Sequence, residues 1–164
     1  MTPIPADFTI RLIQRQDNPQ VAKIIRQVSA EYGLTPDKGY GVSDPTLDKM
    51  AQTYADAGAN YWVVCQGDTI LGGAGIAPLT QHSDVAELQK MYFSKTLRGK
   101  KMALPLYQIC QQFAQDYGYH TLYLETTAIL VEALEFYTQL GFKTCQHLGD
   151  TGHDACEIAM KKTL

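Results

Sequence analysis

The sequence predicts a mixed α/β fold (α+β mixed), a β-sheet flanked by helices, in one domain that spans residues 1–164. Two observations indicate this fold: strand-like runs joined by short turns occupy the first half, and a β-α-β unit follows in the second. The chain is long enough for one substantial core, and it contains neither an internal repeat nor a linker. With 45% hydrophobic and 19% charged residues, its composition is that of a globular protein.

The first three elements are a strand and two helices. Residues 8–13 alternate apolar and polar side chains, as a half-buried strand does. Asp17 can cap a helix that Gly33 ends, and the apolar residues between them recur at helical spacing: Val21, Ile24, Ile25 and Val28. After a loop over 39–45, a second helix is expected to carry Leu47, Met50 and Tyr54.

The central part of the chain predicts a hairpin and a longer strand. Two strand-like runs, 61–65 and 69–77, are joined around Gly67-Asp68, a weaker turn signal than Asn-Gly. Residues 86–93 form the longer strand. The second run also contains three glycines, which mark a bulge or close packing in a strand more often than a phosphate cradle: Gly72, Gly73 and Gly75.

The last third of the chain predicts two more helices and three more strands. They follow a basic loop over 94–101 in this order: a helix over 102–117, a strand over 121–125, a helix over 128–140 that ends before Gly141, and closing strands over 142–147 and 156–160 around a turn region at 149–154. Both helices carry apolar residues at helical spacing, so each is expected to pack one face on the sheet.

Charge and cysteine usage exclude several classes of protein. The formal net charge of -3 disfavours a nucleic-acid partner, because phosphate contacts need a basic surface. No apolar run is long enough to span a membrane, and the N-terminus lacks the pattern of a signal peptide. The cysteines are widely spaced and form no CxxC motif: Cys65, Cys110, Cys145 and Cys156. These features predict reduced thiols and a cytoplasmic protein.

Cations concentrate between the strand over 86–93 and the helix that begins near residue 102. They are Lys95, Arg98, Lys100 and Lys101. The first amides of a helix lack backbone partners, and the helix dipole favours negative charge there, so this loop can bind an anion. A solvated basic turn explains the same charge run equally well from these residues alone.

Two motifs resemble the GNAT superfamily of acyl-CoA-dependent acyltransferases. The family's phosphate loop reads Arg/Gln-x-x-Gly-x-Gly/Ala, and here Arg98 and Ala103 match its ends while Lys101 replaces a glycine. Residues 133–142, Ala-Leu-Glu-Phe-Tyr-Thr-Gln-Leu-Gly-Phe, are similar to the family's Ala-x-x-(Leu/Phe)-Tyr-x-x-x-Gly-Phe segment. Residues 122–126 resemble the strand before that segment, and 25–40 and 87–93 resemble an uncharacterised bacterial branch of the family.

The resemblance implies a fold and a reaction. The fold would be a mostly antiparallel, mixed sheet of six or seven strands with about four helices. The reaction would move an acetyl group from the co-substrate acetyl-CoA to an amine by direct attack in a ternary complex, with no metal. Lys101 and Leu130, which replaces a frequent asparagine, depart from the family pattern. They motivate the alternative of a non-catalytic acyl-CoA-binding module; a protein-binding domain that has lost CoA is a third reading.

The resemblance also assigns roles to residues. Pyrophosphate would bind the loop and helix start: Arg98, Gly99, Lys100, Lys101, Met102 and Ala103. The pantetheine arm would pair with the strand end: Met91, Tyr92 and Phe93. Tyr137 would protonate the departing thiolate, whereas spacing alone favours a half-buried core tyrosine.

The amine needs a group that takes up its proton, because an ordinary amine is mostly protonated near neutral pH. Glu87 is the first candidate by resemblance, Glu125 is the alternative, and water is a third. Alternation separates Glu125 from Leu122 and Leu124, so it is expected on the opposite face of its strand. The acceptor would be a small-molecule or peptide amine. Glu31, Tyr32 and Tyr40 are candidates for binding it, because the first two helices resemble the family's acceptor-binding region, whereas a plain surface role is the preferred reading of these residues. A homodimer is compatible with the family.

A possible metal site lies near the C-terminus. Two sulfurs and two imidazoles occur at spacings that suit zinc in principle: Cys145, His147, His153 and Cys156. The spacing is not that of a standard zinc finger, and alternation does not place all four on one face. A hairpin with two buried thiols is therefore the preferred interpretation, and no metal is expected.

Overall fold

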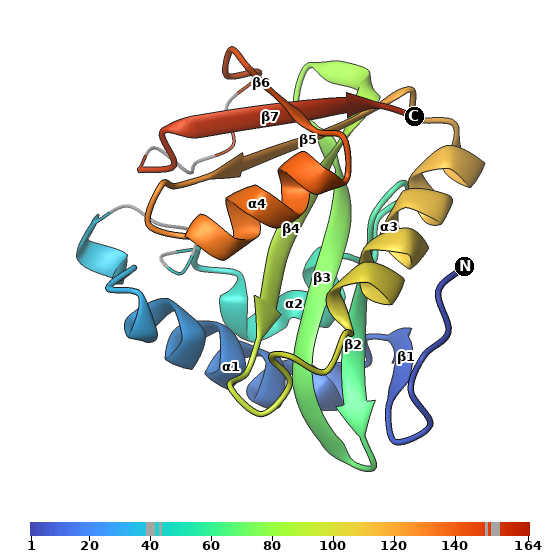
Figure 1. Cartoon of the computed structure of the whole chain (residues 1–164), viewed down its shortest axis with the longest axis vertical. Coiled ribbons are helices and arrows are strands. Elements are labelled where there is room, and N and C mark those ends of the chain that lie inside the picture. Colours follow the sequence, from blue (N-terminus) through green and yellow to red (C-terminus); the bar gives the residue numbers. More distant parts are fainter. Residues whose placement is uncertain (39–41, 43, 150, 152–154) are drawn as a thin grey trace.

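The computed structural model describes the chain except for residues 39–41, 43, 150 and 152–154 (Figure 1). Its centre is a seven-stranded sheet with the order β1-β2-β3-β4-β5-β7-β6. The strands are β1 (Thr9–Leu12), β2 (Asn60–Gln66), β3 (Thr69–Leu79), β4 (His82–Phe93), β5 (Thr121–Thr126), β6 (Lys143–Cys145) and β7 (Ile158–Thr163). Only β4 and β5 pair in parallel, which confirms the predicted mixed, mostly antiparallel sheet.

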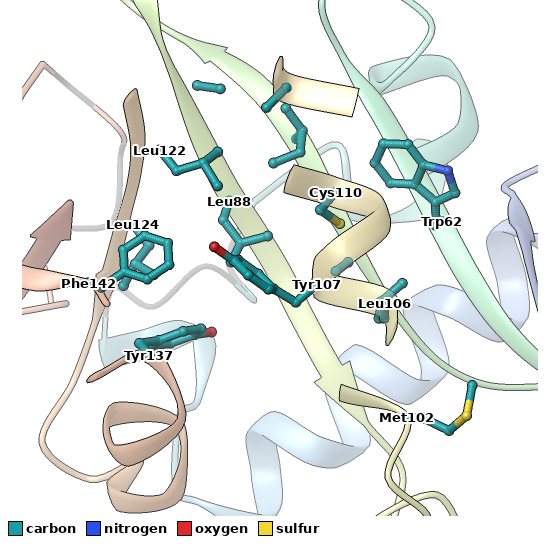
Figure 2. Packing of buried hydrophobic residues seen from close by; sticks show 14 of the residues in the cluster. Trp62, Leu88, Met102, Leu106, Tyr107, Cys110, Leu122, Leu124, Tyr137 and Phe142 are labelled. Atoms are coloured by element: carbon teal, nitrogen blue, oxygen red, sulfur yellow. The ribbon is translucent and has the colours of Figure 1, made fainter. Parts of the chain in front are cut away.

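Helices cover both faces of this sheet. The described residues form α1 (Asn18–Glu31), α2 (Met50–Thr53), α3 (Ala103–Tyr117) and α4 (Val131–Gln139). α3 and α4 pack on one face, in a core that contains Leu88, Leu122 and Phe142 (Figure 2). α1 and α2 pack on the other face, where Val63 and Tyr61 of β2 are fully buried. None of the helices described is long and apolar enough to cross a membrane.

The start of α1 differs from the expected capping. The helix begins after Asp17, but this side chain makes no capping bond to the first turn. It pairs instead with Arg11 of β1 at 2.7 Å and accepts the amide of Gln14 at 2.7 Å. Pro19, the second residue of the helix, favours the first turn in place of a side-chain cap, because its fixed φ suits that turn and it lacks an N–H to satisfy.

Several element boundaries were predicted wrongly. α4 begins at Val131 rather than 128, because Glu157 accepts the amide of Ala128 at 2.7 Å and holds a turn there. The two closing strands are Lys143–Cys145 rather than 142–147 and Ile158–Thr163 rather than 156–160. β7 reaches Thr163 because it pairs with β5 along that strand's whole length.

The N-terminal half also differs in length at two elements. The second helix is only a 3-10 turn, Leu47–Lys49, followed by the four residues of α2. β4 begins at His82 rather than 86, because its first residues continue the hairpin with β3. The predicted loop over 39–45 and the turn region at 149–154 lie partly outside the described residues.

The glycines of β3 permit close packing, as the sequence indicated. A Cβ at Gly73 would lie 2.6 Å from the Tyr61 ring, and one at Gly75 would lie 2.6 Å from Tyr61 and 2.8 Å from Tyr54. Any larger residue would therefore displace these two tyrosines. The glycines provide space for aromatic rings on the α1 and α2 face, and they do not form a phosphate cradle.

β4 separates from β5 after a short contact. The two strands are in register only from Val85–Glu87 of β4 to Thr121–Tyr123 of β5, although β4 continues to Phe93. Lys90 has a φ of 48°, and the pairing of β4 with β3 shifts at this point, so a bulge bends the strand. The end of β4 therefore presents backbone groups to a gap in the sheet instead of to a neighbouring strand.

Candidate functional site

A cavity of about 520 Å³ lies where β4 and β5 separate. It brings together three parts of the chain that are far apart in the sequence: the C-terminal half of α1, the end of β4 with the loop that follows it into α3, and the start of α4. Most of the predicted cofactor-binding residues line it: Met91, Tyr92, Phe93, Arg98, Gly99, Lys101, Met102 and Ala103. Tyr137 also lines the cavity, whereas Lys100 is exposed and does not.

The loop into α3 presents unpaired amides to this cavity. The backbone N–H groups of Gly99, Lys101 and Met102 donate to no backbone carbonyl of the described residues. Gly99 and Lys101 both have left-handed backbone, with φ of 76° and 61°. This alternation of conformations turns successive amides toward one side, and the positive end of the α3 dipole reinforces them. The arrangement suits an anionic group such as a phosphate.

Arg98 is directed away from that anion site. Its Nε donates to the carbonyl of Phe93 at 3.1 Å, and its Nη2 lies 2.6 Å from a carboxylate oxygen of Glu31. The guanidinium also lies 5.5 Å from the ring centre of Tyr32. The side chain thus fixes the loop to the end of β4 and to α1, and it engages two residues that the sequence had suggested for acceptor binding.

Tyr137 reaches the cavity from α4. Its side chain is 9% exposed, and its ring packs on Phe142 at a centroid distance of 5.9 Å (Figure 2). The hydroxyl makes one described contact, a weak bond to Sδ of Met91 at 3.9 Å. Burial raises the pKa of this phenol well above its ordinary value, so it stays protonated at physiological pH. A buried hydroxyl with such a weak acceptor can donate to a ligand in the cavity.

Glu87 and Glu125 lie on the face of the sheet opposite to α3 and α4, because their neighbours along the strands, Leu88 and Leu124, belong to the core on the α3 and α4 side. Glu87 pairs in register with Tyr123 of β5, and it is 3% exposed. Desolvation raises the pKa of Glu87 from 4.5 to about 7; a hydrogen bond from Gln89 lowers it, and the charge of Glu125 raises it. Glu125 accepts the hydroxyls of Tyr123, at 2.5 Å, and of Thr151. Neither glutamate lines the cavity itself.

Sequence reasoning missed part of the cavity wall. Apolar residues of α1 and its C-terminal loop, and of the approach to α4, also line it: Val28, Leu34, Ile129, Leu130 and Val131. Ile129 and Val131 are exposed by 48% and 58%, which is unusual for large apolar residues. In the sequence, the signal that could have identified them is the unbroken apolar run over 128–131 at the start of the helix. Tyr40, suggested for the acceptor, lies outside the described residues.

The cysteine and histidine pattern near the C-terminus forms a different contact. Nε2 of His147 lies 2.9 Å from the carbonyl oxygen of Cys156, so the imidazole holds the backbone between β6 and β7. In the part of the chain that the structure describes, no three His, Cys, Asp or Glu side chains are grouped to hold a metal. His153 lies outside that part.

Comparison with known proteins places the chain in a family. Residues 27–142 match the model of the acetyltransferase (GNAT) family. The chain is 49% identical over 162 residues to the uncharacterised N-acetyltransferase YjgM of Escherichia coli (strain K12), across 98% of this chain and 97% of that protein.

Solved structures share the fold. An acetyltransferase of the GNAT family from Staphylococcus aureus Mu50 has a TM-score of 0.83 at 19% identity, over 96% of this chain and 99% of that one. The yncA protein of Salmonella typhimurium, solved with its cofactor acetyl-CoA, has a TM-score of 0.74 at 15% identity, over 96% and 94% of the two chains. The family match and the near full-length relative decide the assignment: the chain belongs to the GNAT family of acetyltransferases.

Proposed function

We propose that this protein transfers an acetyl group from acetyl-CoA to an amine by direct attack in a ternary complex, with the whole site in one domain of residues 1–164. The observation that carries the proposal is the convergence of three features on one cavity. These are the unpaired amides before α3, the unpaired end of β4 and the hydroxyl of Tyr137. The four cysteines are free thiols, which supports a cytoplasmic location.

The residues around the cavity fit CoA. The pyrophosphate needs several amide donors and positive charge, which the loop from Gly99 to Ala103 supplies. The space around Gly99 is open, since a Cβ there would meet nothing within 4 Å. The pantetheine arm is an amide-containing chain, and the backbone of Met91 and Phe93 offers strand-like partners for it. When bound, acetyl-CoA supplies an activated thioester, so no enzyme nucleophile is needed.

The chemistry of the chain's own residues is proton transfer and electrostatic stabilisation. Glu87 takes the proton of the amine, directly or through water, because its pKa of about 7 suits a base at neutral pH. An amide of β4 stabilises the negative charge that develops on the carbonyl oxygen. Tyr137 donates its proton to the departing sulfur. The base and the amide both belong to β4 and the acid belongs to α4. The separation of β4 from β5 lets groups on both faces act on one bound pair.

The test is a screen of amines with acetyl-CoA, in which release of free thiol is measured. We expect turnover with at least one class among amino acids, polyamines, aminoglycosides, small peptides and protein lysines. If the protein binds acetyl-CoA and acetylates none of these classes, the non-catalytic acyl-CoA-binding module is the better description. A protein that does not bind CoA at all contradicts both.

Lys101 gives a test of the phosphate loop. Its left-handed backbone is one that glycine adopts at no steric cost, so Lys101→Gly removes strain worth about 1 kcal/mol and a similar entropic cost offsets it. We expect unchanged stability within about 1 kcal/mol, retained CoA binding, and a weaker dependence of the Kd for CoA on salt.

The matched control for this change is Lys101→Ala. It removes the same charge and keeps the Cβ and the backbone strain of the wild type, so it should show the same salt dependence as Lys101→Gly and a melting temperature near that of the wild type. Loss of CoA binding in both variants would mean that the lysine makes a specific contact, which contradicts a purely electrostatic role. Titrations of CoA at several salt concentrations, together with thermal unfolding, provide the measurements.

A further inference from the structure

A chain of side-chain hydrogen bonds connects α2 to Glu87. The hydroxyl of Tyr54, the residue that follows α2, donates to Oε1 of Gln89 at 2.6 Å. Nε2 of Gln89 donates to Oε2 of Glu87 at 2.9 Å. We propose that Gln89, oriented by Tyr54, is a positioning residue that holds Glu87 in its ionised, proton-accepting form. This inference rests on the proposed function, because it assumes that Glu87 is the base.

The packing fixes Tyr54 in place. Its side chain is 4% exposed, and its ring lies 5.2 Å from that of Tyr61. The space for both rings comes from the glycines of β3, since a Cβ at Gly75 would lie 2.8 Å from Tyr54. Tyr61 in turn donates to the carbonyl of Lys90 at 2.8 Å, at the bulge of β4. The hydroxyl of Tyr54 is therefore held where the Gln89 amide can meet it.

The direction of the two bonds sets the protonation state that is favoured. An amide has a donating nitrogen and an accepting oxygen, and an ionised carboxylate can only accept. Because the Tyr54 hydroxyl donates to Oε1, the nitrogen of Gln89 is the part that faces Glu87. Protonated Glu87 would need an acceptor in that place, which requires the amide to turn around and the Tyr54 bond to reverse. The chain thus favours ionised Glu87 against the cost of its burial.

Among the other charged and titratable groups near Glu87, one raises its pKa, one lowers it, and two are neutral. Glu125 on β5 raises its pKa, and Lys90 on β4, which pairs with Asp44 at 3.1 Å, lowers it less than Gln89 does. The thiol of Cys156, before β7, and the phenol of Tyr54 are both neutral near pH 7, because burial raises the pKa of each. Gln89 therefore favours the charged form through a direct hydrogen bond, and Lys90 favours it through its charge.

The experiment measures the pKa of Glu87 directly. In protein with ¹³C-labelled glutamate and bound CoA, the Glu87 signal is assigned by its loss in Glu87→Gln and followed against pH. Gln89→Met removes the donor at nearly constant volume, and we expect it to raise the pKa of Glu87 by about one to two pH units. Tyr54→Phe should give a smaller rise, and the double variant should match Gln89→Met, because the tyrosine acts through the amide.

A matched control separates positioning from loss of structure. Tyr119→Phe also deletes a buried tyrosine hydroxyl, which bonds to the carbonyl of Gly58 at 2.9 Å on the α3 and α4 side of the sheet. It should lower the melting temperature and leave the pKa of Glu87 unchanged. An unshifted pKa in Gln89→Met, or an equal shift in Tyr119→Phe, overturns the inference. If Gln89→Met does not fold, the pKa of Glu87 in Tyr54→Phe is the test, and an unshifted value there overturns the inference.

The same variants distinguish this inference from the proposed function. The titration of Glu87 needs no amine, so it succeeds or fails independently of turnover. With an active amine, the acidic limb of kcat against pH should move upward in Gln89→Met by the same amount as the pKa. If Gln89→Met shifts the pKa of Glu87 but leaves the acidic limb of kcat in place, Glu87 is not the base, and Gln89 then has no positioning role in catalysis.

Discussion

Replacing Tyr137 with phenylalanine is expected to lower kcat by about 10²–10⁴-fold, the usual contribution of a general acid. Burial raises the pKa of the phenol, and a thiolate that departs beside it would be desolvated too, so the proton affinity of both would rise and transfer between them would remain feasible. Among the described residues the hydroxyl has only a sulfur acceptor, at 3.9 Å, so its removal should cost at most about 1 kcal/mol of stability. CoA affinity should stay near that of the wild type.

The matched control is Tyr107→Phe. Tyr107 also packs on Phe142, but its hydroxyl donates to Gln111 at 2.6 Å and receives a bond from Lys162 at 3.3 Å. Its removal should therefore lower the melting temperature and leave kcat nearly unchanged. If instead Tyr137→Phe keeps its full rate, Tyr137 is a core residue and not the acid. Melting temperature, CoA affinity and kcat on both variants provide the comparison.

Glu87→Gln should be less active and, at high pH, more stable than the wild type. Glutamine cannot accept the amine's proton, so kcat should fall by about 10²-fold or more, and the acidic limb near pH 7 should disappear. The pKa of Glu87 is raised in the folded protein, so the folded state binds this proton more tightly than the unfolded chain. Wild-type stability therefore falls as the pH rises from 4.5 to about 7, and it stays at the lower level above that.

The size of this effect follows from the difference between the two pKa values. It corresponds to roughly 3 kcal/mol of unfolding free energy for the buried carboxylate. Glutamine stays neutral, so denaturant unfolding at pH 4 and pH 8 should show this loss in the wild type and not in the variant. An identical pH dependence in both proteins would contradict the burial of a charge at Glu87.

Glu125→Gln is the comparison that assigns the base. Because the charge of Glu125 raises the pKa of Glu87, its removal should move the acidic limb of kcat to lower pH. If the limb disappears in Glu125→Gln and persists in Glu87→Gln, the base is Glu125. Each variant removes one negative charge, from neighbouring strands on the same face of the sheet. A difference between them therefore reports the position of the carboxylate and not the total charge.

The main features of the fold could be predicted because they follow from local patterns. Apolar spacing and turn residues depend only on the chain, and together they predicted the order of the seven strands and four helices that the described residues form. The boundaries failed where a residue from elsewhere intervened. Glu157, about thirty residues away in the sequence, fixes the turn at Ala128, and the full length of β5 extends β7.

The candidate site, too, was predictable only where it depends on residues that are close in the sequence. Every helix begins with amides that lack backbone partners, so the Arg98–Ala103 loop could be predicted to bind an anion from the sequence alone. The position of Gln89 beside Glu87 could also have been predicted, because residues two positions apart in a strand lie on the same face. The contact of Gln89 with Tyr54 could not, since only the packing of α2 over β3 brings these two residues together.

The sequence by itself determined the order of elements, and it predicted an anion-binding loop and the segment that carries Tyr137, because each of these depends on residues close together in the chain. Only the tertiary structure decided that Arg98 binds Glu31 instead of facing the loop's anion site, and that β4 leaves β5 after Glu87. It also decided the raised pKa of Glu87, which desolvation causes. Desolvation and strand separation depend on which distant segments pack around a group, and the pattern of neighbouring residues does not contain that information.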